Sequence, residues 1–115
     1  GALLMHLGGL AVIAYHAPRT YLHVVFNNGV HDSVGGQPSS IGVVDVAGTA
    51  RALGYRYATS ASELGSISEA VARLRSAGGP ALLEVRVRPG NRPGLGRPTR
   101  TPAESKRAFM VAMRD

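Results

Sequence analysis

The sequence contains no cysteine, so disulfide bonds and thiolate-ligated metal sites are excluded. It has no apolar run approaching the roughly 20 residues that a helix needs to span a bilayer. It also lacks the Gly-Lys-Ser/Thr and Gly-x-Gly-x-x-Gly strings that mark phosphate-binding loops. No basic and then apolar signal pattern precedes a cleavage site, so we expect the protein to be cytoplasmic.

Acidic residues are few, with seven against thirteen basic ones, and the formal net charge is +6. Eight of the basic residues lie from Arg86 onward, and an arginine-rich half can bind nucleic acid or phosphorylated ligands. These arginines are scattered, however, and the few aromatic side chains do not interleave with them as a single-strand binding surface would need. We therefore expect no nucleic-acid partner, and a basic nucleic-acid binder stays only as a third alternative.

A hydrophobic content of 44% in 115 residues is enough for one domain with a modest core. Apolar periodicity and turn residues divide the chain into alternating helices and strands. The predicted helices are 2–14, 45–53, 63–76 and one that starts at 101–104, and the predicted strands are 21–26, 55–58 and 81–87. This order, with short connections, predicts an α/β fold with a doubly wound parallel sheet.

Capping residues support three of these helices. Asp45 is expected to cap the second predicted helix, and Ser60 or Ser62 the third. Thr101 with Glu104 three residues later predicts a capping box at the start of the last helix.

The first predicted strand is apolar apart from His23, which we expect to be a satisfied core or interface histidine, and this composition is typical of a strand buried on both faces. The strand ends at Asn27-Asn28-Gly29, whose residue types tolerate left-handed backbone angles and favour a tight turn.

The polar, glycine-rich segment 30–42 is predicted to be a loop without secondary structure, and such a loop is more often functional than not. Ligands bind at the carboxyl ends of strands in parallel sheets, so we expect the site here.

The residues of this turn could hold a magnesium ion and a diphosphate. Mg²⁺ prefers oxygen ligands, and the Asn28 side chain with the Val30 carbonyl could supply two of them. The nearest carboxylates in sequence belong to Asp32 and Asp45. The helix that begins at the first residue offers unpaired amides for a diphosphate. An ordinary strand-to-loop turn is the alternative interpretation.

Histidines offer a second kind of chemistry. His31 could act as a general acid or base beside a cofactor, or it could be a solvated loop histidine. The adjacent residues His31, Asp32 and Ser33 are not expected to form a catalytic triad, because neighbouring side chains rarely point at one another. His6 and His16 are ten residues apart and lack the spacing of a helical zinc pair.

Several segments carry a more specific signal, above all the loop His31-Asp-Ser-Val-Gly-Gly-Gln-Pro38 and the turn Asn27-Asn28-Gly29. These segments closely resemble the phosphonopyruvate decarboxylase family of thiamine-diphosphate-dependent enzymes. The resemblance extends to residues 1–10, 22–29, 80–89, 95–98 and 101–109. The turn resembles the end of that class's Gly-Asp-Gly…Asn-Asn signature, whose leading Gly-Asp would lie before residue 1. We therefore expect this chain to be the C-terminal part of a longer cofactor domain.

The resemblance implies that thiamine diphosphate and Mg²⁺ are the cofactors. It also implies decarboxylation of 3-phosphonopyruvate to phosphonoacetaldehyde and carbon dioxide. Carried over by position, Gly1 and Ala2 would contact the diphosphate. Asn28 would ligate Mg²⁺ through its side chain and Val30 through its carbonyl, while Gly29 would permit the turn.

The same resemblance places His31, Asp32 and Ser33 around the thiazolium and the incoming substrate, as the catalytic residues. It implies a partner that this chain lacks, a pyrimidine-binding domain or subunit with a catalytic glutamate, and a homo-oligomer. Residues 1–90 would belong to the diphosphate-binding domain, and 91–115 would form an Arg/Pro-rich tail with a helix. The alternatives are a sulfopyruvate decarboxylase, another thiamine-diphosphate 2-oxo acid decarboxylase, or a non-catalytic interaction domain.

Overall fold

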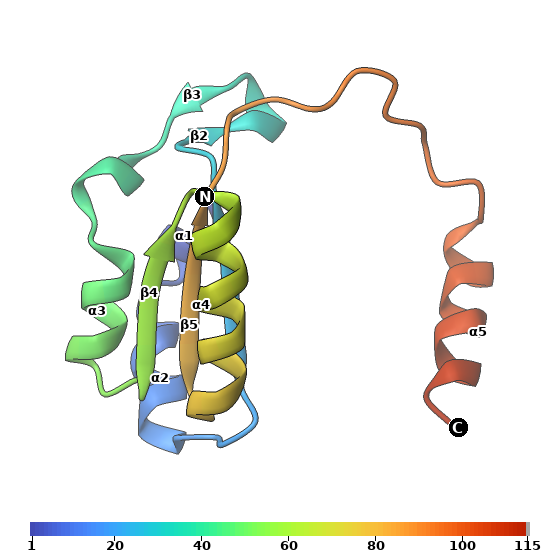
Figure 1. The fold of residues 1–115 in the computed structure, drawn as a ribbon. Coiled ribbons are helices and arrows are strands. Elements are labelled where there is room, and N and C mark those ends of the chain that lie inside the picture. The colour runs from blue at the N-terminus through green and yellow to red at the C-terminus, as the bar shows by residue number, and fades with distance from the viewer. Residues whose placement is uncertain (115) are drawn as a thin grey trace.

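The computed structural model describes residues 1–114 and has a three-stranded parallel sheet at its centre (Figure 1). The strands are β1 (Leu22–Asn27), β4 (Tyr57–Ala61) and β5 (Ala81–Arg86), in the spatial order β1-β5-β4. Strand β5 is therefore the central strand, and it pairs in parallel with both neighbours. All three strands place their carboxyl ends at one edge of the sheet.

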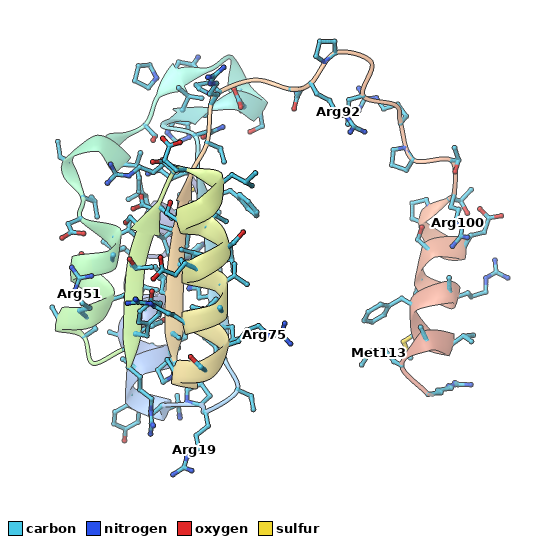
Figure 2. All side chains as sticks on the ribbon, viewed as in Figure 1. Arg19, Arg51, Arg75, Arg92, Arg100 and Met113 are labelled. Atoms are coloured by element: carbon cyan, nitrogen blue, oxygen red, sulfur yellow. The ribbon has the colours of Figure 1, made fainter. Side chains whose placement is uncertain are left out.

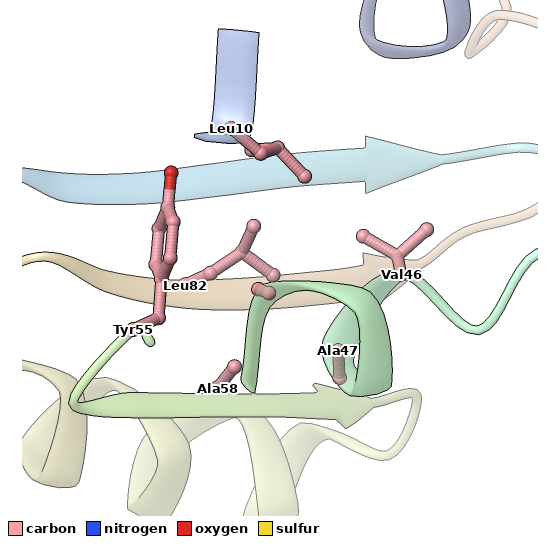
Figure 3. Packing of buried hydrophobic residues seen from close by; sticks show 7 residues of the cluster. Leu10, Val46, Ala47, Tyr55, Ala58 and Leu82 are labelled. Carbon is pink, nitrogen blue, oxygen red and sulfur yellow. The ribbon is translucent and has the colours of Figure 1, made fainter. Parts of the chain in front are cut away.

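Helices cover both faces of this sheet, as the doubly wound prediction requires (Figure 1). Helices α1 (Ala2–Met5), α2 (Gly9–His16) and α3 (Val46–Ala52) lie on one face, and α4 (Leu64–Ala77) lies on the other. The core under α2 and α3 is drawn in Figure 3 and consists of Leu10, Val46, Ala47, Ala50, Tyr55, Ala58 and Leu82. The core under α4 consists of Ala61, Ala70, Leu74, Ala81, Leu83 and Val85.

Two of the predicted caps are confirmed. The Asp45 carboxylate accepts a 2.8 Å hydrogen bond from the Gly48 N–H at the start of α3. Helix α5 (Pro102–Ala112) begins with the predicted capping box, formed by Thr101 and Glu104. The cap predicted for α4 is wrong: its N-cap residue is Glu63, which makes no side-chain capping bond.

The prediction of one helix over 2–14 is wrong, because α1 and α2 are separated by a turn at 6–8. Gly8 and Gly9 lie at this break, and adjacent glycines weaken a helix by about 1 kcal/mol each relative to alanine. The strand predicted at 55–58 is also displaced, since β4 spans Tyr57–Ala61.

The segment 30–42 is not a structureless loop, contrary to the prediction. It forms a two-residue hairpin of β2 (Val30–His31) and β3 (Gln37–Pro38), with short 3₁₀ turns η1 (Asp32–Val34) and η2 (Ser40–Val43). Gly35 and Gly36 reverse the chain with φ of 105° and 74°, angles that favour glycine.

Strand β1 is not buried on both faces as predicted, because it lies at the edge of the sheet. Its side chains on the α1–α3 face are partly buried. On the opposite face Leu22, Val24 and Phe26 are 41%, 44% and 73% exposed, since α4 packs over β4 and β5.

The segment after β5 leads away from the sheet to α5 (Figure 2). Every residue of α5 is exposed, including the apolar residues Phe109, Met110 and Met113. Over residues 1–114, none of the helices has the length and apolar character that crossing a membrane would require.

Candidate functional site

The carboxyl end of β1 forms a turn in which two consecutive asparagine side chains bond to the backbone. The Asn27 Oδ1 accepts a 3.0 Å hydrogen bond from the Gly29 N–H, and the Asn28 Oδ1 accepts one of 3.2 Å from the Val30 N–H. Gly29 takes a φ of 75°, which glycine adopts without strain. The tight turn predicted from the sequence is therefore confirmed. Both side-chain amide oxygens are held at the edge where parallel sheets bind ligands.

Asp32 is the carboxylate that the fold brings to Asn28. The Asn28 Nδ2 donates a 2.7 Å hydrogen bond to Asp32 Oδ2, and the Gly90 N–H donates to the same oxygen at 3.2 Å. Asp45 serves instead as the cap of α3, and its carboxylate lies 3.9 Å from the Arg51 guanidinium. Of the two nearest candidates in sequence, only Asp32 contacts Asn28.

The first residue of the chain lies against the hairpin that carries His31. A Cβ built on Gly1 would lie 3.1 Å from His31 Nδ1 and 3.4 Å from its Cε1, so a side chain here would crowd the imidazole. In the described part of the chain no hydrogen bond joins the side chains of His31, Asp32 and Ser33 to one another, and the Asp32 carboxylate binds Asn28 and Gly90 instead.

Two cavities meet at the asparagine turn. One, of about 430 Å³, extends along β1 beneath α1 and α2, and Gly1, Ala2 and Asn28 contribute to its lining. The other, of about 380 Å³, lies toward β5 and is lined in part by Glu84 and Arg86. Asn27 and Asn28 line both cavities, whereas the predicted catalytic residues 31–33 line neither.

Glu84 lies at the candidate site, and the sequence analysis did not single it out. It is 2% exposed, and its carboxylate accepts a 2.6 Å hydrogen bond from Asn27 Nδ2 and another from the Ser60 hydroxyl. The guanidinium of Arg86, itself largely exposed, lies 3.7 Å away. A glutamate within the apolar run Ala-Leu-Leu-Glu-Val was the available signal, because a buried charge requires partners.

Two buried polar atoms near the core have no hydrogen-bond partner within residues 1–114: Nδ1 of His23 and the hydroxyl of Tyr55. The expectation of a satisfied core histidine is therefore wrong for the Nδ1 of His23, while the interface alternative stays a prediction. Burial lowers the pKa of His23. Burial, together with the nearby Tyr21, raises the pKa of Tyr55 to about 12. Neither atom belongs to the asparagine turn.

The chemistry of the donor set at the turn fits a magnesium ion shared with a diphosphate. Residues 1–114 contain no group of three or more His, Cys, Asp or Glu side chains that could hold a metal alone. The available donors are amide and backbone oxygens, with the carboxylate of Asp32 beside Asn28 and that of Glu84 beside Asn27. An amide oxygen has two lone pairs, so Asn28 Oδ1 can accept the Val30 N–H and still ligate a cation. Mg²⁺ commonly keeps few protein ligands when it bridges phosphates.

Comparison with known proteins gives a match over the same part of the chain. Residues 1–85 match the family model described as "Thiamine pyrophosphate enzyme, C-terminal TPP binding domain". This range contains the whole sheet except the last residue of β5, and all of the residues of the asparagine turn.

Three curated relatives are similar to the chain. It is 45% identical over 109 residues to a phosphonopyruvate decarboxylase of Streptomyces viridochromogenes and 41% identical to one of Streptomyces hygroscopicus. Both alignments cover 95% of this chain and, respectively, 28% and 27% of the relative. It is 31% identical over 91 residues to a sulfopyruvate decarboxylase subunit beta of Methanothermobacter thermautotrophicus, covering 79% of this chain and 46% of the relative. The chain spans less than half the length of each relative.

Proposed function

Because the chain belongs to the family of C-terminal thiamine pyrophosphate-binding domains of thiamine pyrophosphate enzymes, we propose that it forms the diphosphate-binding part of a Mg²⁺-dependent 3-phosphonopyruvate decarboxylase. The products of that reaction are phosphonoacetaldehyde and carbon dioxide. The observation that carries the proposal is the Asn28–Asp32 pair at the carboxyl edge of a parallel sheet, within a chain 45% identical to a phosphonopyruvate decarboxylase.

In this proposal Mg²⁺ is held by the Asn28 Oδ1 and by the carbonyl of Val30. Asp32 accepts from the amide nitrogen of Asn28, which leaves the amide oxygen as the ligand atom. Gly1 and Ala2 contribute backbone N–H groups to the diphosphate, and the absence of a Cβ at Gly1 keeps His31 close to that position.

When bound, thiamine diphosphate supplies the electron sink for loss of carbon dioxide from a 2-oxo acid. The chain's own residues bind and orient. In the family-based assignment His31 acts as a general acid or base toward the substrate or product. Asp32 and Ser33 contact the substrate side of the cofactor in the family-based assignment, and Asp32 also orients Asn28.

The substrate class rests on the relatives. Two relatives are phosphonopyruvate decarboxylases and a third is a subunit of a sulfopyruvate decarboxylase, so the sulfonate analogue is the second candidate. Identity and coverage of this chain are both higher for the phosphonate enzymes, which favours 3-phosphonopyruvate.

The active enzyme also requires a pyrimidine-binding domain or subunit, and we propose that it is a cytoplasmic homo-oligomer. The relatives are longer than this chain, and one of them is named as a beta subunit. Residues 1–114 alone are expected to be inactive. In the thiamine-diphosphate family that the chain resembles, the glutamate that activates the aminopyrimidine lies in the pyrimidine-binding domain.

The test is an assay of the intact natural protein, with every subunit that it needs, for release of carbon dioxide. Substrates are 3-phosphonopyruvate, sulfopyruvate and pyruvate, with and without thiamine diphosphate and Mg²⁺. We expect the highest kcat/KM with 3-phosphonopyruvate, dependent on both cofactors. A preference for sulfopyruvate would establish the second candidate. A protein that binds neither cofactor would overturn the proposal in favour of a non-catalytic interaction domain.

A further inference from the structure

Glu84 is the one buried charged side chain of residues 1–114, and it lies in the central strand of the sheet. Removing a carboxylate from water is costly unless partners compensate, and an apolar residue would fill the same space at lower cost. A charged group at such a place therefore calls for a reason besides stability.

The register of the sheet shows which residues surround this carboxylate. Glu84 is opposite Val25 on β1 and Ser60 on β4, so it lies between both neighbouring strands. It shares a face with Leu82, the face that α2 and α3 cover, but it lies one step nearer the carboxyl edge. Its two oxygens bind Asn27 from β1 and the Ser60 hydroxyl from β4.

The Asn27 amide links Glu84 to the turn. Its nitrogen donates to Glu84 Oε1, while its oxygen accepts from the Gly29 N–H. A carboxylate can only accept here, so it allows a single orientation of the amide, with the oxygen toward Gly29. A residue at position 84 that neither accepts nor donates a hydrogen bond would leave the side-chain amide of Asn27 free to rotate. The hydrogen bond from the Gly29 N–H to Asn27 would then no longer be held in place.

We infer that Glu84 is a positioning residue for the Mg–diphosphate site: acting through Asn27, it holds the turn that presents Asn28 and the Val30 carbonyl. The inference rests on the proposed function and deepens it. The two turn bonds are consecutive, from Gly29 N–H to Asn27 and from Val30 N–H to Asn28, so loss of the first loosens the segment that contains the second. Groups that orient metal ligands typically change metal affinity about 10- to 100-fold when they are removed.

The experiment uses the intact protein from which Mg²⁺ and thiamine diphosphate have been removed. Titration calorimetry measures binding of Mg–thiamine diphosphate, and the thermal midpoint of unfolding is measured on the cofactor-free protein. Wild type is measured first, and failure to bind there would contradict the proposed function itself. The variants are Glu84→Leu, Glu84→Gln and Asn27→Asp, with Glu69→Gln as the control. Glu69 is an exposed partner of Arg73 on α4, far from the turn in sequence and on the opposite face of the sheet.

A positioning role predicts that Glu84→Leu weakens binding about 10-fold or more. Glu84→Gln should keep most of the affinity, because its amide oxygen can still accept from Asn27 while its nitrogen donates to the Ser60 hydroxyl. Asn27→Asp should weaken binding as Glu84→Leu does, since it sets two carboxylates together, and it provides the test if Glu84→Leu does not fold. Glu69→Gln should bind as wild type does.

A double variant tests the route. If Glu84 acts through Asn27, Glu84→Leu combined with Asn27→Asp should bind no more weakly than the weaker single variant. If the losses of binding free energy in the two single variants add up in the double variant, Glu84 does not act through Asn27. A Glu84→Leu protein with a lower thermal midpoint but wild-type affinity would show a purely structural role and overturn the inference, as would wild-type affinity in Asn27→Asp.

Discussion

The side-chain amide of Asn28 donates a 2.7 Å hydrogen bond to the carboxylate of Asp32, four residues further along the chain. The bond crosses from the turn after β1 to the 3₁₀ turn η1, and the Gly90 N–H after β5 donates to the same carboxylate oxygen. Asp32 therefore joins three segments at the carboxyl edge of the sheet. It also determines which atom of the Asn28 amide remains available to a cation.

Replacing Asp32 tests this relationship. We expect Asp32→Ala to weaken binding of Mg–thiamine diphosphate about 10-fold, because the Asn28 amide loses the acceptor that orients it. Calorimetry on the intact protein measures the dissociation constant. The matched control is Asp45→Ala, which removes the cap of α3 and should cost about 1 kcal/mol of stability while leaving the affinity unchanged. Equal affinities in wild type and Asp32→Ala would disprove the orienting role.

Gly79 lies where the chain enters β5, closely packed against the segment before β1. A Cβ there would lie 2.5 Å from the Pro18 carbonyl oxygen, 2.6 Å from the Tyr21 carbonyl oxygen and 2.7 Å from the Tyr21 nitrogen. Backbone atoms cannot move aside cheaply, so Gly79→Ala should destabilise the fold by about 3 kcal/mol or more.

The comparison variant for Gly79→Ala is Gly65→Ala, in α4, where a Cβ meets no atom within 4 Å. Alanine is the better helix former by about 1 kcal/mol, so this variant should raise the stability. Chemical denaturation of both proteins measures the two effects. A Gly79→Ala protein as stable as wild type would contradict the packing described for Gly79.

Tyr55 predicts a dependence of stability on alkaline pH. Its pKa is raised from 10.0 to about 12 in the folded protein. The folded state thus keeps a proton that the unfolded state loses first, and this contribution to stability is present below pH 10 and is lost as the pH rises toward 12. Tyr55→Phe should remove this loss, so the variant's advantage in unfolding free energy should increase between pH 10 and 12.

At neutral pH the same variant should be about 1 kcal/mol more stable than wild type, because the buried hydroxyl of Tyr55 has no partner in residues 1–114. The control is Tyr15→Phe, at a position that is 86% exposed, which should change stability little at neutral pH. A Tyr55→Phe protein with the same alkaline profile as wild type would refute the assigned cause.

The sequence was sufficient for features that depend on neighbouring residues. The alternation of elements, the caps at Asp45 and Thr101, and the turn at Asn28 follow from local periodicity and local hydrogen-bonding capacity, and the structure has all of them. The family resemblance and the parallel α/β fold are likewise confirmed.

Features that depend on distant residues could not be obtained in this way. An apolar strand looks the same whether or not a helix covers it, so the exposed face of β1 was predicted as buried. The choice of Asp32 over Asp45 depends on where the hairpin folds, and the role of Glu84 depends on the register of three strands. The assignment of 31–33 as catalytic residues stays a prediction.

The central claim is that the turn after β1 binds a diphosphate together with Mg²⁺. The most direct test is a calorimetric titration of thiamine diphosphate into the intact, cofactor-free protein, in the presence of Mg²⁺ and again with the metal chelated. The account predicts saturable binding at one site per chain that is lost when Mg²⁺ is removed. Absence of binding with Mg²⁺ present, or equal affinity without the metal, would contradict it.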